Sequence, residues 1–225
     1  MRLGFVHTVP ALAVRFDELL RERRPASTAV HVVDPQLLAE AVRSGVGPRI
    51  EAAVDAHVRH LVTAGADAVL VTCSSIGEAT EAVGARSGVP VLRIDTAMAQ
   101  RAMQLASAAT GRIAVLATLE ATLGPTGRLL QRLSADHGTT LELAVVPGAL
   151  AAREAGDGER HDALIADAVT AAARSADVIV LAQASMAGAA ARSAVGIPVL
   201  SSPESAVDAA IERLEMHDGA AGPPQ

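Results

Sequence analysis

Residues 66–78, Ala-Asp-Ala-Val-Leu-Val-Thr-Cys-Ser-Ser-Ile-Gly-Glu, predict a buried strand that ends in a polar loop carrying the single cysteine, Cys73. A helix is predicted to follow at once, with Ser75 as its N-cap and Glu78 at the capping-box spacing. Cys73 would then precede a helix N-terminus, where free N–H groups and the helix dipole favour a thiolate and attract carboxylates. The alternative is that Cys73 is an inert buried residue, as most cysteines after apolar strands are.

The composition limits the classes of function. A chain of 225 residues, half of them hydrophobic, can form one large domain or two small ones. The net charge of −6 argues against nucleic acid or an anionic membrane as a partner. All 19 residues counted as Lys or Arg are arginine, so a lysine Schiff base and a phosphate-binding P-loop are excluded.

The single cysteine excludes an internal disulfide, and no apolar run is long enough for a signal peptide or a membrane span. We therefore expect a soluble, cytoplasmic protein. His57 and His60 share a helical face, but no third ligand has suitable spacing, so no metal site is predicted.

Apolar strands and helices alternate along the whole chain. Strands are predicted at residues 3–6, 29–33, 66–71, 88–92, 112–116, 141–146, 177–182 and 197–200, and a helix between Pro125 and His137. Residues 147–158 are predicted to form an irregular loop. The alternation indicates an α/β fold with parallel sheets flanked by helices.

The two halves of the chain are related at a constant spacing. Asp67 corresponds to Asp177 and Cys73 to Gln183, and both pairs differ by 110 (183 − 73 = 110). We infer an internal duplication that produces two pseudo-symmetric lobes. The predicted boundaries are residues 1–95 plus 200–217 for lobe 1, 96–199 for lobe 2, and a flexible tail at 218–225. Because ligands of open α/β sheets bind at the carboxyl ends of the strands, the active site is expected in the cleft between the lobes.

Three motifs carry a resemblance to a known family. They are Thr-Cys-Ser-Ser at residues 72–75, Leu-Ala-Thr at 116–118 with Thr122 four residues on, and Val-Leu-Ala-Gln-Ala-Ser-Met at 180–186. The chain resembles the aspartate/glutamate/hydantoin racemase superfamily, which also includes maleate isomerase and arylmalonate decarboxylase. The resemblance implies a cofactor-independent site, a small carboxylate as substrate, and a homo-oligomer, dimeric or larger.

The resemblance also assigns roles to residues. Cys73 matches the first of the two family cysteines that exchange a proton at the substrate α-carbon, and Gln183 stands where the second would be. A glutamine amide cannot exchange that proton, but it can donate a hydrogen bond to an enolate or carboxylate oxygen. His7 is a candidate for the missing second acid or base. The predicted substrate-binding residues are Thr8, Pro10, Ser74, Ser75, Thr118, Thr122, Ala184 and Ser185.

Three functions remain open at this point. The first is a racemase or isomerase acting through Cys73 alone. The second is a decarboxylase of a substituted malonate-type acid, in which Cys73 donates one proton. The third is a non-catalytic small-molecule binding protein that has lost the second cysteine.

Overall fold

The computed structural model describes residues 1–134 and 138–220, and it divides the chain into two compact units. The first unit contains Met1–Ile94 together with the segment from Pro203 onward, and the second contains Asp95–Ser202. The chain therefore passes from the first unit to the second and back again. Within the described residues, no helix is long and apolar enough to cross a membrane.

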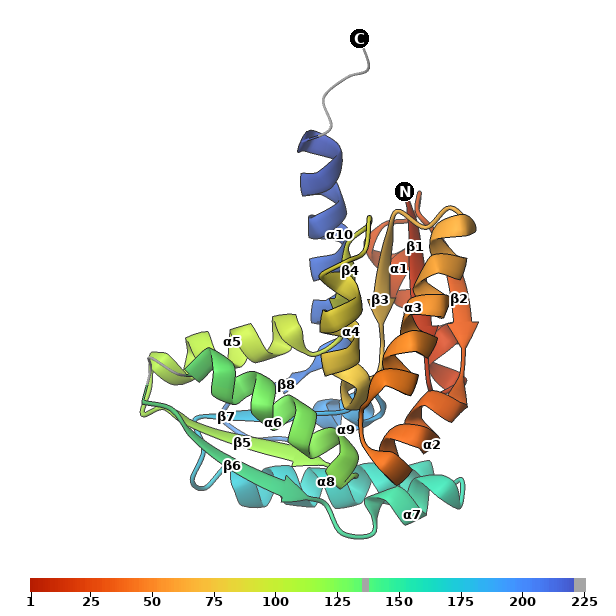
Figure 1. The fold of residues 1–225 in the computed structure, drawn as a ribbon. Helices are drawn as coiled ribbons and strands as arrows, with labels where there is room; N and C mark the ends of the chain where they lie inside the picture. Colours follow the sequence, from red (N-terminus) through yellow and green to blue (C-terminus); the bar gives the residue numbers. More distant parts are fainter. Residues whose placement is uncertain (135–137, 221–225) are drawn as a thin grey trace. The chain divides into compact units, whose positions relative to one another are not determined.

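The first unit is built on a four-stranded sheet in the order β2-β1-β3-β4, with all neighbouring strands parallel (Figure 1). Its elements are β1 (Arg2–His7), α1 (Ala11–Arg23), β2 (Thr28–Val33), α2 (Pro35–Ser44), α3 (Pro48–Thr63), β3 (Ala68–Val71), the 3-10 helix η1 (Ser74–Ile76), α4 (Gly77–Gly84), β4 (Val91–Arg93) and α10 (Ser202–Ala220).

The second unit repeats this plan with the strand order β6-β5-β7-β8, again with parallel neighbours. Its elements are α5 (Thr96–Ser107), β5 (Arg112–Ala117), α6 (Glu120–Ser134), β6 (Thr140–Val145), α7 (Ala149–Glu154), α8 (Gly158–Ala172), β7 (Val178–Leu181), the 3-10 helix η2 (Ala184–Met186), α9 (Ala187–Arg192) and β8 (Val199–Ser201).

The strand registers reproduce the 110-residue spacing of the sequence. Leu3 pairs with Ala68 in the first sheet, and Ile113 pairs with Val178 in the second. The hydrogen bonds at the start of the first strand of each unit also correspond. Asp67 accepts the backbone N–H of Arg2, and Asp177 accepts that of Arg112. The two units thus share topology, register and local hydrogen bonds, as an internal duplication predicts.

Both faces of each sheet are covered by helices, as expected for parallel strands of continuous apolar sequence. In the first unit, Val6, Val69, Val71 and Cys73 lie in a cluster with apolar residues of α2, α3 and α4, and Phe5 on the opposite face contacts Phe16 of α1. In the second unit, α5 and α6 cover one face and α8 and α9 the other.

Several helix boundaries differ from those predicted. Ser75 is not an N-cap but lies inside η1, and α4 begins at Gly77 without a side-chain cap. Helix α6 begins at Glu120, because Leu119 O accepts the N–H groups of Thr122 and Leu123. Pro125 therefore lies inside this helix and not at its start. The predicted end of this helix at His137 lies outside the described residues.

Two further segments depart from the predictions. The supposed loop at 147–158 contains α7. Strand β8 pairs with β7 up to Ser201, so residues 200–202 stay with the second unit. Helix α10 continues to Ala220, beyond the predicted start of the tail, and the remaining tail residues lie outside the described part.

Candidate active site

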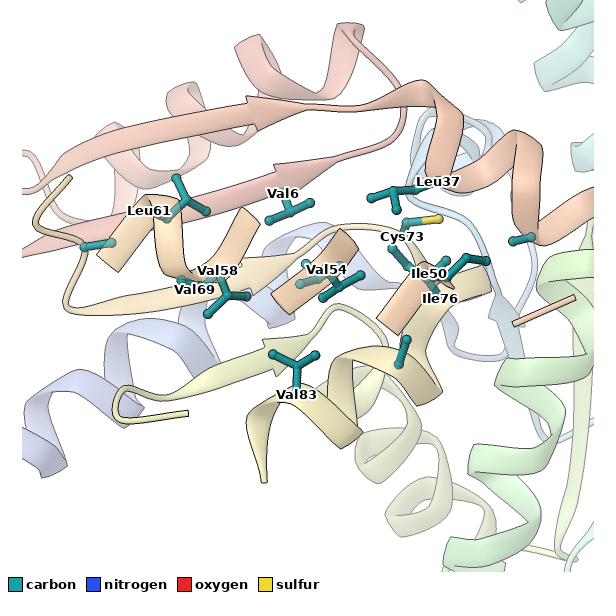
Figure 2. Packing of buried hydrophobic residues seen from close by; sticks show 14 residues of the cluster. Val6, Leu37, Ile50, Val54, Val58, Leu61, Val69, Cys73, Ile76 and Val83 are labelled. Carbon is teal, nitrogen blue, oxygen red and sulfur yellow. The ribbon is translucent and has the colours of Figure 1, made fainter. Parts of the chain in front are cut away.

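Cys73 lies two residues beyond the end of β3, at the carboxyl edge of the first sheet. Its extended backbone (φ −127°, ψ 108°) makes it the N-cap residue of η1. Figure 2 shows its side chain at one end of the apolar cluster, near Leu37, Ile50 and Ile76. The residue is 8% exposed, so the thiol lies at the edge of the core rather than on an open surface.

Burial and hydrogen bonding act in opposite directions on the Cys73 thiol. Burial raises its pKa and is the larger effect. Hydrogen bonds from the side chains of Thr8 and Ser75, and from the backbone N–H groups of Ser75 and Ile76, lower the pKa. The free protein therefore holds a protonated thiol, surrounded by donors that stabilise the thiolate formed when the proton leaves.

Gln183 occupies the corresponding place in the second unit, as the N-cap residue of η2 (φ −128°, ψ 136°). Its side-chain oxygen Oε1 accepts hydrogen bonds from Thr118 N, at 2.5 Å, and from Thr118 Oγ1, at 2.8 Å. A backbone N–H can only donate, so the amide oxygen must face Thr118. The amide NH₂ of Gln183 is thereby left as the group that can donate to a ligand.

The Thr118–Gln183 contact reproduces the Thr8–Cys73 contact of the first unit, because both members of each pair are 110 residues apart. In each unit, the residue after the first strand donates to the residue that begins the 3-10 turn. The two turns therefore share a hydrogen-bonding frame, in which one carries a thiol and the other an amide.

Arg153 of α7 contacts the η2 turn through its side chain. Its Nη1 donates to Ser185 Oγ at 2.6 Å. Burial lowers the pKa of the guanidinium, and the charge of the neighbouring Glu154 offsets this only in part; no salt bridge of Arg153 is found among the described residues. A partly buried guanidinium beside the Gln183 turn is suited to binding an anionic group.

Comparison with known families agrees with this geometry. The family model described as Asp/Glu/Hydantoin racemase matches residues 8–210, which include both turns. This chain belongs to the Asp/Glu/Hydantoin racemase family. A comparison with curated proteins finds no match.

Solved structures of racemases and of a decarboxylase share the fold. Picrophilus torridus aspartate racemase is 15% identical with a TM-score of 0.73, covering 95% of this chain and 94% of that one. Allantoin racemase from Pseudomonas fluorescens is 22% identical with a TM-score of 0.69, covering 96% and 92%. A glycine-to-cysteine mutant of arylmalonate decarboxylase, in a sulfate ion associated form, is 20% identical with a TM-score of 0.63, covering 96% and 94%.

The structure of this racemase-family chain brings together most of the predicted site residues within each unit. In the first unit, Thr8, Ser74 and Ser75 are buried around the Cys73 turn. In the second unit, Gln183, Ala184 and Ser185 form the matching turn, with Thr118 bonded to Gln183 and Thr122 buried in the first turn of α6. Pro10 differs, because it is exposed at the start of α1.

His7 does not have the surroundings of an acid or base in this racemase-family fold. Its side chain is fully buried, and its Nδ1 and Nε2 contact Thr72 Oγ1 and His31 Nδ1. Burial, with a smaller contribution from His31, lowers its pKa to about 3. Strand alternation also turns His7 to the face opposite Thr8 and Cys73. The geometry gives His7 no route to a substrate, and we leave it out of the proposed chemistry.

Two residues that matter to the site were missed in the sequence. Arg153 lies in a six-residue helix, too short to show helical periodicity. His31 lies on β2, and its contact with His7 depends on the pairing of β1 with β2. The signal available for Arg153 was a single arginine between Gly148 and Gly156. The signal available for His31 was a histidine within an apolar strand.

Proposed function

We propose that this chain is a cofactor-independent enzyme that transfers a proton at the α-carbon of a small carboxylate, with Cys73 as the proton-carrying group. The observation that carries the proposal is the set of four hydrogen bonds converging on the Cys73 thiol at the start of η1. Donors aimed at a buried sulfur stabilise the thiolate, as a proton-transferring cysteine requires. An inert core cysteine needs no such donors.

The Gln183 amide is proposed to bind the substrate's carboxylate oxygens. Loss of an α-proton next to a carboxylate places additional negative charge on those oxygens, so the site needs donors aimed at them. The Gln183 oxygen is held by Thr118, which fixes the NH₂ as a donor. Gln183 thus contributes hydrogen bonding where a second cysteine would contribute proton transfer.

Arg153 is proposed to bind a carboxylate of the substrate or a second anionic group. Its guanidinium is partly withdrawn from water and bonds to Ser185, and the charge of Glu154 offsets only part of the cost of burial. Such a group gains most from an anionic ligand, because the ligand offsets the cost of burying the charge. This favours acidic substrates over neutral amides.

A specific observation favours decarboxylation as the second candidate. Burial keeps Cys73 protonated in the free protein, which suits a proton donor better than a base. In this reaction the bond between the α-carbon and one carboxylate breaks, and carbon dioxide leaves. The electron pair remains as an enediolate that takes the thiol proton, and water then reprotonates the thiolate. The arylmalonate decarboxylase mutant among the fold neighbours is consistent with this alternative.

The test is a panel of α-substituted carboxylates and malonates in deuterated water, with wild type beside Cys73→Ser. Proton transfer predicts α-deuterium incorporation, and decarboxylation predicts release of carbon dioxide. Either activity should fall at least about 100-fold in Cys73→Ser, the usual scale for a positioned acid or base. Turnover unchanged in the variant would refute the role of Cys73. Ligand-induced stabilisation without any turnover would instead identify a binding protein.

A Thr63→Val variant provides the folding control, because Thr63 is an exposed residue at the end of α3. Sedimentation of the wild type tests the homo-oligomer that the family resemblance implies.

A further inference from the structure

Four rings form a compact cluster on the α1 face of the first sheet. Phe5 and His7 of β1 stack on His31 of β2, with centroid separations of 5.0 Å and 5.2 Å, and Phe16 of α1 lies 5.7 Å from Phe5 and from His7. The chain contains two phenylalanines, and both pack against this histidine pair. The proposed chemistry at Cys73 uses neither histidine.

The histidine pair connects a surface carboxylate to the residue that precedes Cys73. Asp17 Oδ1 lies 3.8 Å from His31 Nε2, and His31 Nδ1 lies 2.9 Å from His7 Nε2. His7 Nδ1 lies 2.8 Å from Thr72 Oγ1, and that hydroxyl is also within 3.2 Å of the Val6 carbonyl oxygen. Asp17 is 41% exposed at its side chain and His7 is fully buried, so the chain runs from solvent to core.

Thr72 extends the pairing between β1 and β3 by one residue, and the side chains of Thr72 and Cys73 lie on opposite faces of the sheet. Val6 pairs with Val71, and the Thr72 N–H donates to the Val6 carbonyl. Side chains alternate along extended backbone, so His7 meets Thr72 on one face while Thr8 meets Cys73 on the other. The short segment that carries the thiol is therefore held from both sides.

The hydrogen-bond chain has two consistent arrangements that differ by one proton. In the uncharged arrangement, Thr72 donates to His7 Nδ1, His7 Nε2–H donates to His31 Nδ1, and His31 Nε2–H faces Asp17. In the charged arrangement, His31 carries protons on both nitrogens, donates from Nδ1 to His7 Nε2, and His7 Nδ1–H donates to Thr72. The Thr72 hydroxyl must then turn to the Val6 carbonyl.

We propose that His31 and His7 form a two-state proton relay that positions the Cys73 turn through Thr72. One proton gained by the pair resides on His31, beside Asp17, and it changes the tautomer of His7 and the direction of the Thr72 hydroxyl. The proton count balances because the pair takes up one proton from bulk water: His7 Nε2 passes its proton to His31 Nδ1, the added proton is bound at His7 Nδ1, and Thr72 keeps its own hydroxyl proton. Both histidines are positioning residues, because they act on Cys73 only through Thr72.

The charged groups around the pair are few. Helix α1 contributes Asp17, which also bonds to Arg21, while β1 and β3 contribute His7 and the uncharged Thr72 hydroxyl. Burial lowers the pKa of His31, and the charge and hydrogen bond of Asp17 partly offset this effect, whereas a proton added to His7 alone would be buried among rings without a carboxylate. The first proton is therefore assigned to His31.

The test follows the ring nitrogens directly, by long-range ¹H–¹⁵N correlation in protein labelled at histidine, from pH 8 to pH 4, because burial lowers the pKa of His31. We expect His7 to change from the Nε2–H to the Nδ1–H tautomer with the same midpoint as His31 protonation. His57, whose Nε2 bonds to the Asp34 carboxylate, serves as the reference ring. A His7 tautomer that stays constant while His31 titrates would overturn the relay.

The positioning role is tested by alkylation of Cys73 across the same pH range in wild type, Thr72→Val and Thr72→Ser. The rate ratio of wild type to Thr72→Val should change at least twofold across the His31 midpoint, and Thr72→Ser should behave as wild type. A constant ratio would overturn the positioning role. These readouts need no substrate, so they are independent of the proposed enzymatic reaction, and the wild-type titration stands even if Thr72→Val fails to fold.

Discussion

At Cys73, the opposition between burial and hydrogen bonding gives each donor a measurable share of the thiol's acidity. The Thr8 hydroxyl is the first of the groups that lower the pKa of Cys73. A hydrogen bond to a charged group stabilises the charged form. Thr8→Val should therefore raise the pKa of Cys73 and move the midpoint of thiol alkylation to higher pH.

Thr63→Val is the matched control for Thr8→Val, because it makes the same chemical change at an exposed site of the same unit. It should leave the alkylation profile unchanged. Equal profiles for Thr8→Val and wild type would show that Thr8 does not act on the thiolate.

At His7, the low pKa makes stability depend on pH. Because the native pKa is about 3 and the unfolded value about 6.5, the unfolded chain binds one more proton between these values. The free energy of unfolding should therefore decrease as the pH is lowered through this range, by up to about 1.4 kcal/mol per pH unit. His7→Asn should show a shallower slope by one proton, measured by urea unfolding at pH 7, 6, 5 and 4. Parallel curves would contradict the burial of a neutral His7.

Features of single residues could be predicted where they depend on neighbours in the chain, and not where they depend on residues far away in the sequence. The place of Cys73 between a strand and a helical turn could be predicted, since these segments are adjacent in the chain, but the burial that raises the pKa of its thiol could not. The engagement of His7 could not, because His31 and Thr72 lie 24 and 65 residues away. The assignment of His7 as the second acid or base failed because strand alternation sends neighbours to opposite faces, and only the observed register fixes which face holds Cys73.

At the scale of elements, the turn after Cys73 depends on the close approach of Gly77 to Arg93. A Cβ on Gly77 would lie 2.4 Å from Arg93 Cζ, and the Arg93 side chain is buried and paired with Glu81. Gly77→Ala should therefore destabilise the first unit by about 1–3 kcal/mol through overpacking, measured by urea unfolding. Gly88→Ala is the control, because a Cβ on Gly88 would meet nothing within 4 Å and φ is not in the left-handed region. Equal stability of the two variants would refute this contact.

Helix α1 and Arg24, the residue that follows it, are joined to α10 by three exposed ion pairs, Arg15–Glu204, Arg23–Asp208 and Arg24–Glu215. Exposed pairs contribute about 0–1 kcal/mol each, whereas a buried leucine truncated to alanine costs about 2–5 kcal/mol. Leu214→Ala should consequently destabilise far more than Glu204→Gln in urea unfolding, since Leu214 is 1% exposed. A larger effect of Glu204→Gln would mean that the ion pairs, not the apolar face, hold α10.

Element boundaries were predictable where the capping signal is local. Asp34 caps α2 through the N–H of Gln36, with Pro35 as the first helical residue, and an Asp-Pro pair is a local signal for the start of a helix. Helix α7 was not predictable, because six residues after Gly148 carry no periodic pattern. For the same reason the sequence did not single out Arg153, the residue of this helix that we propose binds an anionic group.

At the scale of the whole chain, the duplication was readable because both halves keep the same spacing from first strand to 3-10 turn. The structure adds an exchange of helices: α5 follows β4 of the first sheet but belongs to the second unit, and α10 follows β8 but, after Ser202, belongs to the first. This exchange depends on tertiary packing, which alternating apolar segments do not specify. The shared frame then makes the two turns comparable residue by residue.

The variant Gln183→Cys tests whether the turn of the second unit can support proton transfer. With one thiol, a proton returns to the face from which it left, so wild type should exchange the α-hydrogen with deuterated water faster than it loses optical activity. In Gln183→Cys, the new thiol inherits the Thr118 hydroxyl, as Cys73 has that of Thr8. We expect the rate of inversion to rise at least tenfold toward the rate of exchange, measured by polarimetry and deuterium incorporation on one substrate.

Gln183→Ser is the matched control, because it shortens the side chain equally and supplies a hydroxyl too weakly acidic to return the proton. Both variants lose the amide donor, so both lose its stabilisation of the enediolate, and only the cysteine adds a second proton-transfer group. Inversion that increases in Gln183→Cys but not in Gln183→Ser would show that the second unit retains the frame of a proton-transfer site. Equal inversion rates in the two variants would mean that the frame around Gln183 no longer supports that chemistry, and that the second unit serves only to bind the carboxylate.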